Sequence, residues 1–292
     1  MKRLSALLLA ALLLVSCGEQ YDMRRDLSIY FSNTDEVVRR IRSGIKQHWG
    51  GIEFTYTSHG NNMGDLEDVA AQLMELAYSE TDDPAEGDYL FHQTGGYEVS
   101  YGYTATEGEY SYTVKLAPAY YTTLRQEEKV DEAVAGLAEV FTGSEYDRIR
   151  AVYQYLKDSV SFDKTAAKSE SNHLKTTAYA ALVQHTAVCQ GYSVAAYRLL
   201  RECGISARVV TGTVTLPDGT EEYHAWNLAA IGGRFYNLDI TWDDQLGGEG
   251  YFLKSDDDIP DHRREEKYLS DEFLKSYPMS EKSWETESEE KV

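Results

Sequence analysis

Apolar residues recur with two different periods in the first 122 residues of the chain. Spacings of three and four residues over 37–45 and 66–76 predict two amphipathic helices. Apolar and polar residues then alternate strictly over 97–103 and 110–116, which is typical of two strands of an antiparallel sheet. Helices beside such a sheet predict an N-terminal α+β domain, which we place at residues 27–122.

The rest of the chain predicts helices followed by strands. The helical period returns over 130–141, 149–160 and 189–203, and the polar stretch 163–175 reads as a loop before the third of these helices. A short apolar run at 251–253 is interpreted as the last strand.

Cys189 lies at the start of the third helix, and Gly204 follows its end as a left-handed stop. The unpaired N–H groups and the positive dipole end of a helix favour a thiolate and can also hold a developing oxyanion. Cys203 belongs to the apolar stripe of the helix and is interpreted as a buried small residue. A disulfide between the two cysteines is excluded, because fourteen helical residues separate them by about 21 Å.

A histidine and an aspartate fall on a predicted hairpin. Residues 223–228 and 235–242 are rich in strand formers and flank Gly232-Gly233, a strong signal for a two-residue turn. With that turn, His224 and Asp239 are diagonal neighbours on one face of the sheet, roughly 7–8 Å apart at the backbone. A three-residue loop would shift the register and send the aspartate to the opposite face.

Other residues compete for the same roles. Asp243 and Asp244 follow closely and could instead cap a turn, while His173 and His185 lie near the cysteine in sequence. Neither histidine has a carboxylate partner placed by strand geometry. The hairpin therefore favours the first pair.

Three ordered blocks carry a resemblance to a known family. Ala187-Val188-Cys189-Gln190-Gly191-Tyr192, Tyr223-His224-Ala225-Trp226-Asn227 and Asn237-Leu238-Asp239-Ile240-Thr241-Trp242-Asp243 resemble the core of the transglutaminase-like superfamily, a papain-related group. The resemblance implies an α+β fold over 123–280, with a catalytic helix packed on an antiparallel sheet.

The resemblance also implies how the site is divided among residues. It implies Cys189 as the nucleophile, His224 as general base and acid, and Asp239 as the group that orients the imidazole. Gln184, five residues before the cysteine, is the candidate side-chain donor to the oxyanion. The backbone N–H of the cysteine or of Gln190 is the alternative donor.

Such a triad implies acyl transfer through a thioester on a peptide or glutamine-type amide. We favour hydrolysis, as in a protease or amidase, over protein crosslinking by a lysine amine. A non-catalytic peptide-binding scaffold is the alternative from another class. The sequence has no C-x-x-C, H-E-x-x-H or calcium-loop pattern, so we expect neither a metal nor another cofactor.

The amino terminus predicts export. Lys2 and Arg3 precede an apolar run over 4–15 that is too short to cross a membrane and reads as a signal peptide, residues 1–16. The run ends at Cys17, in a pattern that resembles the bacterial lipobox. We therefore expect a lipoprotein anchored by acyl chains at Cys17, on the periplasmic or cell-surface side, with 17–26 as a tether.

The net charge of the chain limits the classes of molecule that it is expected to bind. The 49 acidic residues outnumber the 28 basic ones, which gives a net charge of −21. Such a chain is a poor partner for nucleic acid, and neutral or basic substrates are favoured, such as a protein, a peptide or a cell-wall peptide. The acidic end, 281–292, is expected to be a disordered tail.

Overall fold

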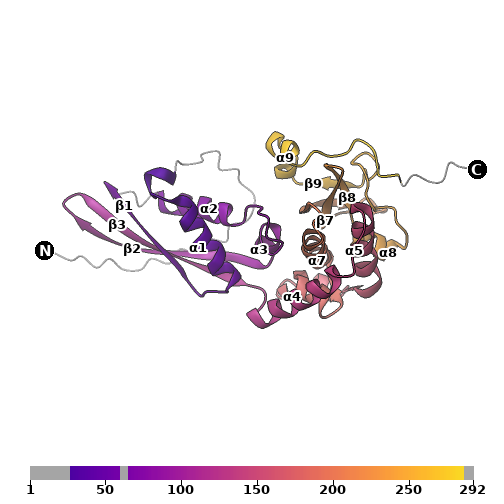
Figure 1. The fold of residues 1–292 in the computed structure, drawn as a ribbon, viewed down its shortest axis with the longest axis horizontal. Coiled ribbons are helices and arrows are strands. Elements are labelled where there is room, and N and C mark those ends of the chain that lie inside the picture. Colours follow the sequence, from indigo (N-terminus) through magenta and orange to yellow (C-terminus); the bar gives the residue numbers. More distant parts are fainter. Residues whose placement is uncertain (1–26, 60–64, 286–292) are drawn as a thin grey trace, which may run out of the picture. The chain divides into compact units, whose positions relative to one another are not determined.

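The computed structural model describes residues 27–59 and 65–285 (Figure 1). The predicted signal peptide, Cys17, the tether and residues 286–292 of the predicted acidic tail lie outside these residues. The expected disorder is wrong for 281–285, because Trp284 N donates to Leu253 O at 2.9 Å and the indole packs on Tyr146. None of the helices in the described ranges is long and apolar enough to cross a membrane.

The described chain divides into two compact units. The first contains residues 27–82 and 93–124, and the second contains 83–92 and 125–285. The sequence placed one boundary near residue 122, whereas the structure groups 83–92 with the second unit. Asp88 explains this, because its carboxylate accepts bonds from Arg208 Nε at 2.7 Å and from Val209 N at 2.7 Å, both in the second unit.

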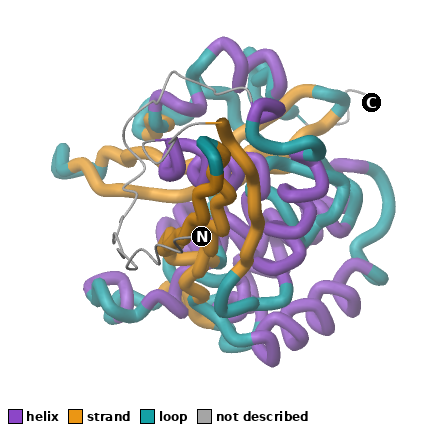
Figure 2. The backbone as a smooth tube through the Cα atoms, turned by 90° about the vertical axis from the view of Figure 1, so that its left-hand side faces the viewer, coloured by secondary structure: helices purple, strands orange, loops and turns teal. Residues whose placement is uncertain are grey.

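The first unit is a sheet with helices on one face. Its antiparallel strands have the order β1-β3-β2. The two longest strands, β2 and β3, run side by side as a ribbon (Figures 1 and 2). Both helices and both strands predicted here are present, and the edge strand β1 was not predicted from the sequence. The elements are α1 (Thr34–Lys46), β1 (Ile52–His59), α2 (Leu66–Ala77), β2 (Thr94–Thr106) and β3 (Glu109–Tyr120).

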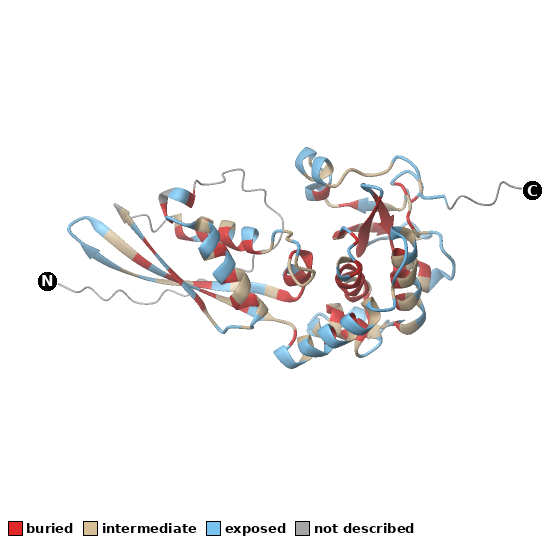
Figure 3. Cartoon of the chain, in the orientation of Figure 1, coloured by how far each residue is buried: buried red, intermediate tan, exposed pale blue. Residues whose placement is uncertain are grey.

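Burial in the first sheet follows the period of two. On β3, Tyr112, Val114 and Leu116 are buried, whereas Thr113 and Lys115 between them are exposed (Figure 3). Successive side chains of a strand point to opposite faces. One face therefore packs against the helices, and the other is polar and open to water.

The second unit combines helices with a four-stranded antiparallel sheet of order β8-β7-β6-β9. This confirms the predicted α+β class. Its helices are α3 (Asp88–His92), α4 (Leu124–Ala138), α5 (Glu145–Ser159), α6 (Ala178–Leu182), α7 (Cys189–Glu202), α8 (Ile240–Leu246) and α9 (Asp271–Ser276). Its strands are β4 (Ser161–Phe162), β5 (Thr186–Ala187), β6 (Ala207–Thr215), β7 (Glu221–Ile231), β8 (Arg234–Leu238) and β9 (His262–Arg264).

Helix α7 is the centre of the second unit. The sequence predicted one buried stripe, but every residue from Gly191 to Leu200 is buried (Figure 3). The cause is that α5, α6, β6 and β7 all pack against this helix. Its first turn is also held closely, since a Cβ on Gly191 would lie 2.7 Å from the carbonyl oxygen of Lys175.

The predicted two-residue turn is confirmed. Gly232 and Gly233 have φ of 59° and 77°, which suits glycine, and Ile231 pairs with Arg234 as the turn requires. The expected strand 235–242 is wrong in its second half, because β8 ends at Leu238 and α8 follows.

The last strand is also not where the sequence placed it. Residues 251–253 form turns and bends, and the strand is β9, which pairs with β6. Gly212 on β6 permits this pairing, since a Cβ there would lie 2.1 Å from the carbonyl oxygen of Arg263.

Candidate active site

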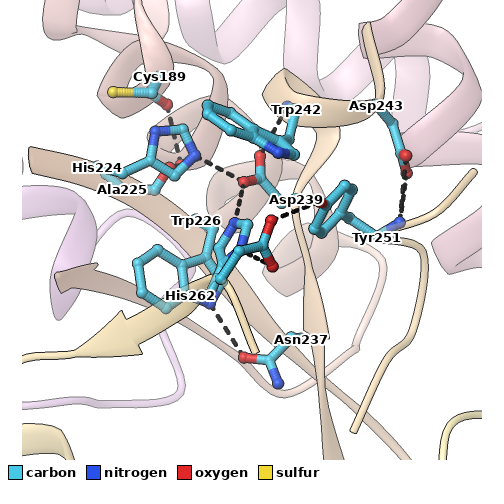
Figure 4. A network of polar contacts seen from close by, with 12 residues as sticks. Cys189, His224, Ala225, Trp226, Asn237, Asp239, Trp242, Asp243, Tyr251 and His262 are labelled. Carbon is cyan, nitrogen blue, oxygen red and sulfur yellow. Dashed lines mark hydrogen bonds and ion pairs between the residues drawn. The ribbon is translucent and has the colours of Figure 1, made fainter. Parts of the chain in front are cut away.

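Cys189 is the first residue of α7 and is half-buried. The N–H groups of a first helical turn have no acceptor within the helix, so they are available beside the thiol. Val188 N donates to Lys175 O at 3.1 Å, which fixes the chain just before the cysteine. Ser193 Oγ lies 2.9 Å from both Cys189 O and Ala225 O, and this ties the first turn of α7 to β7 (Figure 4).

His224 on β7 lies between Cys189 and Asp239 (Figure 4). Its Nε2 is 2.6 Å from Asp239 Oδ2, so its Nδ1 is the nitrogen left on the side of the cysteine. Trp226 stacks beside the imidazole with ring centroids 6.1 Å apart, and Trp242 meets it edge to face at 5.3 Å. The indoles hold the ring in place and shield it from water.

Asp239 reaches the histidine from the end of β8, one residue after the strand. Its Oδ1 accepts a bond from Trp242 N at 3.0 Å and so caps α8, while Oδ2 accepts from His224. The predicted pair is therefore brought together, but by a helix cap and not by two facing strands. Capping fixes the carboxylate, because its two oxygens have separate partners.

Electrostatics favours an ion pair between these two buried groups. Burial lowers the pKa of His224, but attraction to Asp239 and to Cys189 outweighs it and raises this pKa to about 10. Burial would raise the pKa of Asp239, yet His224 and His262 hold it well below its ordinary value. At neutral pH the imidazole is therefore protonated.

The competing residues have other partners. Asp243 accepts bonds from Tyr153 Oη at 2.9 Å and from Tyr251 N at 3.1 Å, and Asp244 accepts from Tyr192 Oη at 2.9 Å. Asp239 is thus the one of the three that bonds His224.

The two competing histidines and the second cysteine do not belong to the His224–Asp239 pair. His173 and His185 are both exposed. Cys203 is buried and free, and burial raises the pKa of its thiol. Cys189 is also free, in keeping with the exclusion of a disulfide.

The two candidate oxyanion donors differ in their surroundings. Gln184 is exposed beyond the end of α6. The side-chain Nε2 of Gln190 lies 3.4 Å from His92 Nδ1, whereas its backbone N–H belongs to the open first turn of α7. The geometry favours the backbone groups of this turn, and the role of Gln184 stays a prediction.

His262 is a site residue that the sequence did not predict. This residue on β9 places its Nε2 2.9 Å from Asp239 Oδ2, so the carboxylate has a histidine on each side (Figure 4). No local period marks it, because only the pairing of β9 with β6 brings it to the site.

His224, Asp239 and His262 are also the one group in the described residues with ligand atoms close enough to hold a metal ion. Their nitrogens lie 2.6 and 2.9 Å from the shared oxygen, which are hydrogen-bond distances. Ligand atoms around a tetrahedral zinc ion are about 3.3 Å apart, as follows from bonds of about 2.05 Å. The spacing of these three side chains therefore fits hydrogen bonds to Asp239 better than coordination of a metal ion.

Part of the chain is similar to known proteins. Residues 135–240 match the model of the transglutaminase-like superfamily. A search of the curated proteins finds no match. Among solved structures, a TGase is similar at 21% identity and a TM-score of 0.36, over 48% of this chain and 43% of the TGase chain.

A second solved structure is the periplasmic domain of TgpA from Pseudomonas aeruginosa. It is 15% identical, with a TM-score of 0.31, over 52% of this chain and 71% of the TgpA chain. The chain thus spans less than half of the TGase and about seven tenths of the TgpA domain. The sequence similarity to the transglutaminase-like superfamily thus covers residues 135–240, which include Cys189, His224 and Asp239.

Proposed function

We propose that the protein is a cysteine-dependent acyl-transfer enzyme. Cys189 is the nucleophile, His224 the general acid and base, and Asp239 the group that orients the imidazole. The observation that carries this proposal is the 2.6 Å bond from His224 Nε2 to a buried carboxylate, which leaves Nδ1 for the thiol.

The reaction follows from these positions. The thiolate of Cys189 attacks an amide carbonyl, and the N–H groups of the first turn of α7 stabilise the oxyanion. The Nδ1 proton of His224 passes to the departing amine, which leaves a thioester on sulfur. Water then attacks the thioester while His224 takes its proton, and the acid leaves as the thiolate is restored.

We propose protein or peptide amides as substrates, including cell-wall peptides. The net charge of −21 favours neutral or basic substrates over nucleic acid. Export and a lipid anchor at Cys17 belong to the same proposal and rest on the sequence pattern of residues 1–17. Protein crosslinking would use the same triad as hydrolysis. It differs only in that a lysine amine, and not water, attacks the thioester.

The reactivity of the two described cysteines tests the proposal. We expect iodoacetamide to modify Cys189 near neutral pH at least tenfold faster than Cys203, because one sits beside an imidazolium and the other is a buried thiol. Peptide mass spectrometry measures both rates in one sample, and His224→Gln should abolish the difference. Equally slow labelling would favour a peptide-binding scaffold.

The second nucleophile needs its own experiment. The enzyme is incubated with a glutamine-bearing protein and a labelled primary amine, with Cys189→Ala as the control. We expect peptide cleavage or ammonia release that depends on Cys189. Incorporation of the amine without cleavage would show a transferase instead.

A further inference from the structure

His262 is the second histidine of the site. Its side chain is wholly buried, and its Nε2 lies 2.9 Å from the same Asp239 oxygen that His224 approaches at 2.6 Å. The carboxylate therefore has three polar partners: the two imidazoles on Oδ2 and the backbone N–H of Trp242 on Oδ1.

The other nitrogen of His262 also faces a carboxylate. Nδ1 is 3.1 Å from Asp261 Oδ1, and the second oxygen of Asp261 accepts a bond from Tyr251 Oη at 2.6 Å. Bonds from Tyr251 and His262 lower the pKa of Asp261 despite its partial burial. An ionised carboxylate can only accept, so each nitrogen of His262 bonds its carboxylate only when that nitrogen carries a proton.

Aromatic rings surround this imidazole. Trp226 and Trp242 meet it nearly perpendicularly, with centroids 5.2 and 5.8 Å away, and Tyr251 lies at 4.9 Å. The rings keep water from the ring nitrogens, so the two carboxylates are the acceptors for its protons.

The chain is built to bring His262 here. His262 pairs with Val214 of β6, and Thr215 N donates to Asp261 O at 2.8 Å. After the strand, Glu265 N donates to Thr211 O at 2.9 Å. These bonds fix both ends of β9 and thereby the ring.

We propose that His262 is a positioning residue of the active site. As an imidazolium between two carboxylates, it keeps Asp239 ionised and aimed at His224. This inference rests on the proposed function, since positioning matters only if His224 works with Cys189. A merely structural ring would need only one proton, because a neutral imidazole can already donate to one carboxylate.

Ring-nitrogen NMR of protein labelled with ¹⁵N-histidine tests the protonation directly. We expect His262 to carry protons on both nitrogens at neutral pH. In Asp261→Asn the neutral amide can donate to Nδ1, and we expect His262 to keep only the Nε2 proton that faces Asp239. A single proton on His262 in the unaltered protein would overturn the proposal.

Two substitutions test the positioning role. His262→Phe fills the same space without a donor, and we expect it to slow alkylation of Cys189 about tenfold or more, as the loss of a bond to a charged group implies. His262→Gln keeps an N–H donor and should recover part of the rate. His173→Gln, an exposed histidine, is the matched control and should react like the unaltered protein. With a substrate, kcat should fall while KM stays constant.

The outcomes separate the two proposals. If Cys189 of the unaltered protein reacts no faster than Cys203, the proposed function fails, and NMR still decides the protonation of His262. If Cys189 reacts fast, and His262→Phe and His262→Gln react equally fast, the positioning role is overturned. Should His262→Phe fail to fold, as near-UV circular dichroism would show, His262→Gln carries the test: a rate equal to the unaltered protein overturns the role, and a slower rate supports it.

Discussion

Polar residues lie on an exposed face of the first sheet, whereas in the second sheet polar side chains are buried. In the first sheet, threonines and charged residues such as Thr55, Thr113 and Lys115 occupy an open face. In the second sheet, β7 is buried continuously from His224 to Ile231, and polar side chains lie inside it. The first sheet shows simple alternation, and the second does not.

Buried polar groups need hydrogen-bond partners, and those that join α7, β7 and β8 have them. Asn227 Nδ2 donates to Ser193 O at 2.9 Å and to Arg208 O at 3.2 Å. Trp226 Nε1 donates to Asn237 Oδ1 at 3.0 Å. Directional bonds of this kind fix α7 on the sheet, and with it the cysteine beside the histidine. In the second sheet, buried polar groups with hydrogen-bond partners therefore accompany the chemical site.

The largest expected effect comes from the carboxylate of the buried site. Asp239→Asn keeps the size of the side chain but presents an amide to His224, so the imidazole loses its orientation and charge partner. We expect kcat/KM to fall by about 10³-fold or more, by analogy with a triad aspartate. Asp35→Asn, on an exposed position of the first unit, is the control and should be active. Retained activity in Asp239→Asn would remove this residue from the mechanism.

A buried amide should come next. Asn227→Leu fills the same space but leaves two buried carbonyls without their bonds to this side chain. We expect the free energy of unfolding of the second unit to fall by about 2–4 kcal/mol, which chemical denaturation measures. A change under about 0.5 kcal/mol would contradict the view that this amide locks helix to sheet.

The ion pair of the site predicts a dependence of stability on pH. The pKa of His224 is raised from 6.5 to about 10 in the folded protein, so folding favours the protonated ring. This stabilisation is complete below pH 6.5 and is lost as pH rises toward 10. We expect the melting temperature of the unaltered protein to fall by a few degrees relative to His224→Gln over that range. If the melting temperatures of the two proteins changed equally with pH, the raised pKa of His224 would be refuted.

The smallest effect is expected on the open face of the first sheet. Thr113→Val changes an exposed side chain on the central strand β3. We expect the unfolding free energy to change by less than about 0.5 kcal/mol and the alkylation of Cys189 to be unaltered. A loss of more than about 1 kcal/mol in thermal or chemical unfolding would mean that this face is covered in the folded protein.

Local patterns in the sequence were sufficient for much of the fold and of the candidate site. The helical period placed α7 and its first residue, Cys189. The paired glycines 232 and 233 predicted a turn whose register the structure confirms. The period of two was also enough for β2 and β3, because one face of their sheet meets water and the other meets helices.

Sequence by itself determined α7, β2, β3, the Gly232-Gly233 turn and the order of the chemically active residues, because helical period, strand period and turn residues are local properties. Only the tertiary structure decided that β8 stops at Leu238, that Asp239 caps α8 while bonding His224, and that His262 reaches the same carboxylate. These contacts join residues 15 and 23 positions apart through burial and strand pairing. Such contacts depend on which surfaces meet when the chain folds, and no local period specifies that.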